Sequence, residues 1–431
     1  MFSPLRHWLH RRRHPVRYAQ LDQLLRNQAL SREQVMEQQR RDLADIVAHA
    51  GNNVPYYREN FSGCENAAFH DLPILTKEAV ASRLDDLLAR DADRAQVKLG
   101  HTGGSTGKPL AFWYDEYKHE LMRAGMMRGF MMSGWRPGQK VMYFWGARHD
   151  TAKGGVFGGG WSAHLGDLIA AEKTIAAVEY SEAKLHEWAR AIQTWRPTLL
   201  YGYASAMSEL ARHILANRLP MPASLIGVYS TAEMLDASQR ELMQQAFACK
   251  VFNQYGCREV PNIAWECRHG HLHVFADLVQ LESVEIEGEN RFLVTSLSNR
   301  LMPFIRYDVG DSGRLLDGDC PCGSPFPLIE MDLFRKNDLI RTRAGATFHP
   351  SYFNRLLYGM TQIRQYQWVQ DEIDRLTLNL VAAAPPSAET VADLRDRLRR
   401  EVDAEMRLEV NYLDEIPRTA AGKHRFVIGL K

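Results

Sequence analysis

A loop rich in glycine and hydroxyl side chains lies near the end of the first quarter of the chain. It consists of Thr102, Gly103, Gly104, Ser105, Thr106, Gly107 and Lys108. Glycine lets the backbone take positive φ angles, so successive N–H groups can converge on an anion, and the hydroxyls and the amine add donors. The loop suits a triphosphate, although a flexible turn between strands explains this segment equally well. It is not a Walker A loop, because Pro109 follows the lysine.

Three further segments combine residue types that a nucleotide site needs. They are Tyr255-Gly256-Cys257-Arg258-Glu259, Arg306-Tyr307-Asp308-Val309-Gly310-Asp311, and the near-terminal run 417–425, which contains Lys423. An aromatic ring can stack on a base, and a carboxylate can hold Mg²⁺ or a ribose diol. A lysine on a loop beside glycine could swing into a distant site. Taken singly, the first two are ordinary loops and the third is a basic exposed tail.

Four residues have the types and spacing of a closed metal site. Cys267 and His273 lie six residues apart, and Cys320 and Cys322 flank a proline. Three thiolates and one imidazole make a tetrahedral zinc set with no free position for water, so a structural rather than catalytic ion is expected. His269 and His271 are alternative histidine ligands, and free thiols without metal are the other interpretation. No apolar signal segment precedes these cysteines, which favours a reducing, cytoplasmic setting over disulfides.

The bulk properties exclude several classes of protein. A net charge of +1 gives no field that would recruit nucleic acid, and no run of eighteen apolar residues predicts a membrane-inserted helix. The arginines and histidines at 10–14 indicate a solvated basic start, or contact with anionic lipid or a partner. The sequence is compatible with a homodimer but does not establish the oligomeric state.

The pattern of elements predicts an α/β protein of two domains, since 431 residues exceed one ordinary core. Residues 1–95 are mostly helical in pattern. Strands and helices then alternate, which predicts a large layered N-terminal domain, residues 1–334, with helices around β-sheets. A hinge at 335–338 would join it to a small mobile α+β domain, residues 339–431.

The order of these motifs resembles the adenylate-forming superfamily, which includes acyl-CoA synthetases, adenylation domains and luciferases. The order is the glycine loop, Tyr-Gly-x-x-Glu, Tyr-x-x-Gly-Asp, Arg335 with Asp338, and the run around Lys423. Within this superfamily, the chain resembles the phenylacetate–CoA ligase branch, which also includes capsule-biosynthesis proteins. The helical opening with Tyr56-Tyr57 and the run 303–307 are similar to that branch.

The resemblance implies a role for each matching position. Residues 102–108 would hold the ATP phosphates, Tyr255 would flank the adenine, and Asp311 would take the ribose hydroxyls with Arg335. Glu259 would be a catalytic magnesium ligand, Asn337 or Asp338 the hinge, and Lys423 the catalytic lysine of adenylation. The acyl pocket would be lined by residues at strand ends, namely Tyr143, Trp145, Tyr201, Tyr229, Ser230 and Thr231. A packed aromatic core is the alternative for half of them.

The activity implied is ATP-dependent activation of a small carboxylic acid, aryl or similarly flat, with coenzyme A as acceptor. An amine acceptor, or a non-catalytic protein of a polysaccharide pathway on the same scaffold, are the alternatives. Three departures bear on the choice: Gly103 replaces a usual Ser, Arg258 a usual Thr or Ser, and Val309 a usual Thr. Some relatives in this branch carry zinc with the spacing seen here.

Overall fold

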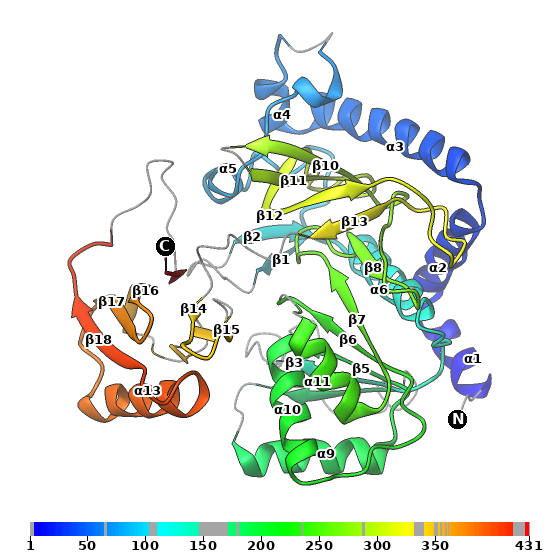
Figure 1. The fold of residues 1–431 in the computed structure, drawn as a ribbon. Helices are drawn as coiled ribbons and strands as arrows, with labels where there is room; N and C mark the ends of the chain where they lie inside the picture. The colour runs from blue at the N-terminus through cyan, green and yellow to red at the C-terminus, as the bar shows by residue number, and fades with distance from the viewer. Residues whose placement is uncertain are drawn as a thin grey trace. The chain divides into compact units, whose positions relative to one another are not determined.

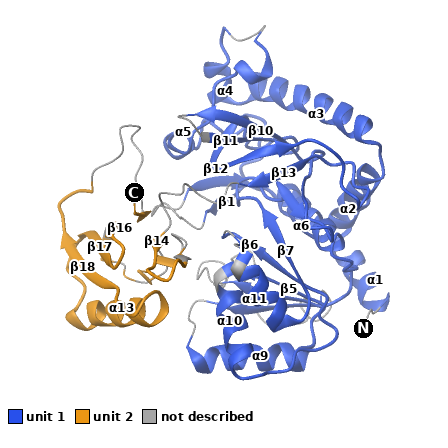
Figure 2. Cartoon of the chain, in the orientation of Figure 1, with its two compact units in different colours: residues 1–102, 110–331 blue, residues 103–109, 332–431 orange. Residues whose placement is uncertain are grey.

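The structure is a computed structural model. It describes residues 4–63, 67–102, 110–145, 171–177, 181–233, 235, 237–286, 289–331, 340–348, 352–353, 356–357, 360, 362–416 and 427–430. The chain forms two compact units, one of residues 1–102 with 110–331 and one of 103–109 with 332–431 (Figure 2). The predicted hinge lies outside the described residues, so its motion stays a prediction. Among the described helices, none is both long and apolar enough to cross a membrane.

An eleven-stranded sheet organises the large unit (Figure 1). Its strand order is β10-β11-β12-β13-β9-β8-β7-β6-β5-β3-β4. In chain order the strands are β3 (Val141–Trp145), β4 (Glu172–Ala176), β5 (Leu199–Tyr203), β6 (Gly227–Thr231), β7 (Lys250–Tyr255), β8 (Ala264–Glu266), β9 (Leu272–Val274), β10 (Val279–Ile286), β11 (Glu289–Ser296), β12 (Tyr307–Leu316) and β13 (Leu328–Met331). Strands β3 to β7 pair in parallel and β7 to β13 in antiparallel fashion, so β7 joins the two halves.

The parallel half is apolar on both faces because helices and other elements cover it. Helices α9 (Glu182–Trp195), α10 (Ala204–Ala216) and α11 (Ala237–Phe247) bury one face, packing on residues such as Met142, Phe144 and Val228. The other face carries Tyr143, Tyr201 and Tyr229 against α6 (Glu116–Met131). Adjacent residues of a strand point to opposite faces, which explains this division. The predicted alternation of strands and helices is therefore confirmed here.

Helix α6 lies very close to the sheet. It begins at an Asp115 cap whose carboxylate accepts from the Lys118 N–H at 2.8 Å. A Cβ atom at Gly129 would lie 2.1 Å from the Trp265 ring, and one at Gly125 would lie 2.5 Å from the Asn262 amide. Glycine at these two positions therefore sets the distance between helix and sheet.

The opening of the chain is helical, as predicted. It comprises α1 (Pro4–Arg13), α2 (Pro15–Gln28), α3 (Arg32–Asn53), α4 (Pro55–Asn60), the 3₁₀ turn η1 (Phe69–Asp71) and α5 (Lys77–Ser82). Ser31 and Gln34 form a reciprocal capping box at the start of α3, at the predicted position. The arginines at 11–13 are exposed, in agreement with the predicted solvated basic start, and they belong to helix α1, in which His10 is buried.

Strands that the sequence did not mark complete the large unit. The motif 306–311, interpreted as a loop, lies mostly in β12. Leu293 pairs with Asp308 and Arg291 with Ser312, so β12 has a bulge between these pairs, and Gly310 has φ +90° there. The bulge explains the loop-like sequence. A separate antiparallel pair, β1 (Lys98–His101) and β2 (Ala111–Tyr114), flanks the glycine loop.

The small unit has a four-stranded sheet in the order β18-β17-β16-β19 and a two-stranded one, β14-β15. Its elements are β14 (Ile340–Arg341), β15 (Thr347–Phe348), β16 (Ile363–Glu372), β17 (Arg375–Ala382), α13 (Ala388–Glu401), β18 (Arg407–Tyr412) and β19 (Val427–Ile428). Helix α13 is capped by Ser387, whose side chain accepts from the Thr390 N–H, and it ends at Glu401. The core of the small unit includes Trp368, Leu378 and Leu398. With both units described, the predicted α/β fold class is confirmed.

Candidate functional site

Two motifs that are far apart in sequence meet in the large unit. Tyr255 ends β7, and its hydroxyl donates to Asp311 Oδ2 at 3.1 Å. Asp311 lies at the bulge of β12. Glu259, four residues beyond Tyr255, accepts from the Tyr307 hydroxyl at 2.8 Å through Oε1. The structure therefore brings the predicted base-binding, ribose-binding and magnesium-binding side chains together.

The second oxygen of Glu259 is the unusual atom of this cluster. Glu259 is 4% exposed, and its Oε2 has no hydrogen-bond partner among the described residues. A buried carboxylate oxygen left without a partner costs free energy unless a donor or cation completes it. The Lys118 amine does not supply that contact, because it donates to the Glu259 backbone oxygen at 2.8 Å. The donor set fits a hard cation such as Mg²⁺.

The base of the glycine loop is tied to the same cluster. Thr102 and Leu110 close it, since the Thr102 N–H donates to the Leu110 oxygen and the Leu110 N–H to Thr102 Oγ1, both at 2.9 Å. Arg258 donates to the His101 carbonyl at 2.9 Å, which links the Tyr-Gly-x-x-Glu turn to β1. Other predicted residues lie outside the described ones: Gly103, Gly104, Ser105, Thr106, Gly107, Lys108, Arg335, Asn337, Asp338 and Lys423.

Lys77 is a cation at this cluster that the motifs did not reveal. It is the first residue of α5, and its Nζ would lie 3.1 Å from a Cβ added at Gly310. Burial raises the pKa of Asp311, while the nearby Lys77 charge and the Tyr255 hydroxyl act to lower it. No sequence pattern signals Lys77, because only the packing of α5 on β12 brings it to the bulge.

The predicted acyl-pocket residues form two rows on the parallel strands. Tyr143, Tyr201, Tyr229 and Phe252 are aligned across β3, β5, β6 and β7, and the three tyrosines pack around Phe130. Tyr229 is fully buried, and its hydroxyl donates to the Gly129 oxygen at 2.9 Å. These inner rings form an aromatic core.

The outer row lies two residues further on, at the carboxyl ends of the strands. There Trp145 is half-buried and stacks on Tyr201 with a centroid distance of 6.1 Å. The Tyr201 hydroxyl donates to Thr231 Oγ1 at 3.3 Å. Ser230 alternates with Thr231, so it lies on the face that α10 and α11 cover. The outer row is thus the part that best suits a ligand.

The predicted metal ligands form a cluster. One ligand atom from each of Cys267, His273, Cys320 and Cys322 lies within 4.8 Å of the others. Cys267 Sγ is 3.6 Å from Cys320 Sγ, and Cys322 Sγ is 3.4 Å from His273 Nε2. His273 Nδ1 lies 3.3 Å from the Phe326 carbonyl, which fixes the ring with Nε2 toward the thiols.

The surroundings of the cluster favour a thiolate at Cys267, whereas burial raises the pKa of the Cys320 thiol to about 12. Burial acts to raise the pKa of the Cys267 thiol, but hydrogen bonds from His273 and from the N–H groups of His271 and His269 lower it to about 5. His271 Nδ1 also lies 3.2 Å from Cys320 Sγ, so it borders the set. Thiolates and a neutral imidazole at these separations fit a tetrahedral ion.

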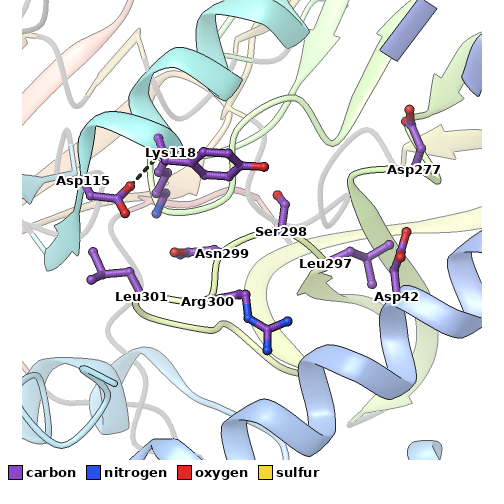
Figure 3. Close-up of a pocket in the computed structure, with 10 residues that line it drawn as sticks. Asp42, Asp115, Lys118, Asp277, Leu297, Ser298, Asn299, Arg300 and Leu301 are labelled. Atoms are coloured by element: carbon purple, nitrogen blue, oxygen red, sulfur yellow. Dashed lines mark hydrogen bonds between the residues drawn. The ribbon is translucent and has the colours of Figure 1, made fainter. Parts of the chain in front are cut away.

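A pocket of the large unit is a separate feature. It has a volume of about 480 Å³ and is lined by Asp42, Asp115, Lys118, Asp277, Asn299 and Arg300 among others (Figure 3). None of its lining residues is a predicted site residue. Only Lys118 connects it to the cluster, through the bond to the Glu259 backbone.

Comparison with solved structures identifies the class of fold. A 2-hydroxyisobutyryl-CoA ligase, solved with 2-HIB-AMP and CoA in its thioesterification state, matches with a TM-score of 0.63 and 18% identity. The match covers 93% of this chain and 91% of that one. The chain thus has the fold of the adenylate-forming CoA ligases, as its motifs suggested.

Comparison with curated proteins narrows the resemblance. Protein CapK of Staphylococcus aureus is 24% identical over 91% of this chain and 89% of its own. A phenylacetate-coenzyme A ligase of Thermus thermophilus is 25% identical over 94% of this chain and 98% of its own. Residues 340–429 match the family model of the CapK C-terminal domain. The resemblance to the phenylacetate–CoA ligase branch and its capsule-biosynthesis relatives is therefore confirmed.

Proposed function

We propose that the protein is an ATP-dependent, AMP-forming acid ligase that converts a carboxylic acid to its acyl-adenylate and transfers the acyl group to coenzyme A. The observation that carries this proposal is the buried, unpartnered Glu259 oxygen beside Tyr255, Asp311 and the closed base of the glycine loop. The names of the relatives and the adenylate and CoA in the similar structure support the same activity.

Each residue would contribute binding or charge to the first step. Tyr255 would flank the adenine, Asp311 with Arg335 would hold the ribose hydroxyls, and the N–H groups and hydroxyls of 102–108 would bind the β- and γ-phosphates. A magnesium ion at Glu259 would neutralise phosphate charge when bound. Lys77 adds a positive charge beside Asp311.

The chemistry is an adenylyl transfer followed by an acyl transfer. A carboxylate oxygen of the acid attacks the α-phosphorus, the bond to the bridging oxygen breaks, and pyrophosphate leaves with the electron pair. Lys423 would stabilise the charge that shifts between attacking and leaving oxygens. The CoA thiolate then attacks the acyl carbon and AMP leaves. Rotation of residues 339–431 about Asn337 or Asp338 would exchange Lys423 for the acceptor between the steps.

The acid would bind against the outer row of the parallel strands. Trp145 and Thr231 offer a flat apolar surface and a hydroxyl there, and Trp145 stacks on Tyr201 of the inner row. The inner rings and Ser230 would support this surface from below. An aryl or similarly flat acid suits this lining.

The Cys₃His cluster would hold a structural zinc ion. Its four side chains come from the β8–β9 turn and the β12–β13 connection, and all four tetrahedral positions would be filled by protein. The ion would therefore fasten two loops and take no part in acyl transfer.

Pyrophosphate release across a panel of carboxylic acids, with and without CoA, tests the proposal. One flat acid should give ATP-dependent pyrophosphate release, and CoA should raise turnover and yield a thioester. Lys423→Ala should lower adenylation by about 100-fold or more while leaving the melting temperature unchanged. Lys98→Ala, on an exposed β1 side chain, is the matched control.

Two results would count against it. The first is that no acid in the panel releases pyrophosphate and calorimetry shows no ATP binding, which would make the scaffold non-catalytic. The second is pyrophosphate release that is stimulated by an amine and not by CoA. This result would support the adenylation step but identify an amine as the acceptor.

A further inference from the structure

The outer side of helix α1 carries a cluster of apolar side chains in contact with solvent. Leu5 is 66%, Trp8 51% and Leu9 38% exposed, and Val16 at the start of α2 is 47% exposed. These are four of the eleven large apolar side chains that are exposed among the described residues. Single exposed apolar residues need no explanation, but three such residues on one short helix do.

Helical spacing explains why the group shares one side. Trp8, Leu9 and Arg12 follow Leu5 by three, four and seven residues, so all four lie along one face of α1. His10 is on the opposite side, where its Nδ1 lies 2.8 Å from the Tyr18 hydroxyl of α2. This buried contact fixes the rotation of α1 and holds the apolar face outward. Figure 1 shows α1 at an edge of the large unit, beside α2.

Arginines surround the apolar face. Arg11, Arg12 and Arg13 are all exposed, and the Arg12 guanidinium lies over the Trp8 ring at 4.8 Å. Arg11 is paired with Asp22. Neither Arg12 nor Arg13 has an ion pair with any residue in the part of the chain that the structure describes. The surface therefore presents positive charge that its own acids do not neutralise.

We propose that α1 and the start of α2 form a docking surface for an anionic lipid bilayer, on which the protein lies peripherally. Trp and Leu would enter the headgroup boundary while the arginines pair with lipid phosphates. Tryptophan beside arginine is a composition that interfaces between water and lipid favour. The proposal does not depend on the ligase activity.

A protein partner fits this surface less well. Four side chains expose only a fraction of the about 800 Å² that each partner of a stable complex usually buries. Charged residues are also depleted from the centres of protein interfaces, whereas Arg12 lies within the apolar face here. Binding to a lipid surface combines the buried apolar area with electrostatic attraction to anionic headgroups, and this surface offers both.

Flotation of the full-length protein with lipid vesicles tests the proposal. Vesicles of phosphatidylcholine with about one third phosphatidylglycerol should bind the protein at about 0.1 M salt and release it at about 0.5 M, while pure phosphatidylcholine vesicles should bind little. Arg12→Gln with Arg13→Gln should lower the partition coefficient about 30-fold. Trp8→Ser with Leu9→Ser should lower it at least about tenfold.

Matched controls come from the small unit. Arg399→Gln with Arg400→Gln removes the same charge from exposed positions of α13, and Tyr412→Ser with Leu413→Ser removes a comparable exposed apolar pair. Both should bind vesicles as the unchanged protein does. All variants should keep the same thermal unfolding, since every altered side chain is exposed.

Three outcomes would overturn the proposal. Absence of binding to the anionic vesicles is the first, and it can be scored on the unchanged protein even if a variant fails to fold. Equal loss of binding in the control variants is the second. A dimer in gel filtration that the Trp8→Ser, Leu9→Ser variant converts to a monomer would assign the surface to self-association instead.

Discussion

At the scale of single residues, the candidate site depends on one carboxylate held in an unusual state. Tyr307 binds one oxygen of Glu259 and fixes the side chain, and the second oxygen is buried without a partner among the residues that the structure describes. Folding energy alone does not favour this arrangement. A bound cation would explain it, which makes Glu259 the residue where the proposal can be tested most directly.

We expect Glu259→Gln to fold and to lose most of its adenylation activity. The amide oxygen can still accept from Tyr307, but an amide carries no charge for the ion. Pyrophosphate release should fall about 100-fold or more, and the Mg²⁺ concentration for half-maximal rate should rise. Glu330→Gln, at an exposed position of β13, should change neither quantity. Unaltered magnesium dependence in Glu259→Gln would remove the assignment.

At the scale of elements, two turns that are distant in sequence are held together by the Cys₃His cluster. Cys267 and His273 flank the β8–β9 turn, whereas Cys320 and Cys322 lie on the connection from β12 to β13. Only a few buried apolar side chains, such as Leu328, pack beside them. A metal would supply the cross-link that this small cluster of apolar contacts does not.

The purified protein is accordingly expected to contain one zinc ion per chain. Cys320→Ser should remove most of the zinc and lower the melting temperature by about 3 °C, because the loss of such a cross-link costs on the order of 2 kcal/mol. Elemental analysis and thermal unfolding measure the two effects. Cys249→Ser, a free thiol outside the cluster, is the control. Zinc-free protein with an unchanged melting temperature on adding zinc would contradict the assignment.

At the scale of the whole molecule, the N-terminal helices are joined to the sheet by buried charges. Arg17 pairs with Glu120 of α6 at 2.8 Å, and Arg123 pairs with Glu172 of β4. His10 lies among them with its Nε2 unpartnered within the described residues. Burial and the Arg17 charge lower the pKa of His10 to about 3. This environment makes global stability depend on pH.

Acid should therefore destabilise the fold before the carboxylates titrate. The unfolded chain protonates His10 below pH 6.5, whereas the folded protein resists protonation down to about 3, so stability falls as pH falls through this window. His10 alone should cost about 1.4 kcal/mol at pH 5.5 relative to neutral pH. Urea unfolding at both pH values measures it. His10→Gln should show a smaller loss and exposed His70→Gln the same loss as the unchanged protein; equal losses in all three would refute the idea.

The sequence predicted the parallel half of the sheet well because its strands are short, apolar and separated by helices. It failed in the antiparallel half. Strand β12 contains Asp308, Gly310 and Asp311, residue types that predict a turn. This segment is extended because it pairs with β11 and β13. The motifs placed Tyr255, Glu259 and Asp311 through resemblance, but a single lysine such as Lys77 has no motif and becomes visible only when α5 packs on β12.

The missing side chain of Gly129 has a further consequence. The indole of Trp265 occupies the volume that any other residue at 129 would need, so the helix backbone and the ring compete for one space. Gly129 also supplies the carbonyl that accepts from the Tyr229 hydroxyl. This hydrogen bond fixes the position of the aromatic core against α6. Any larger residue at 129 would force the helix and the sheet apart unless Trp265 were replaced by a smaller residue at the same time.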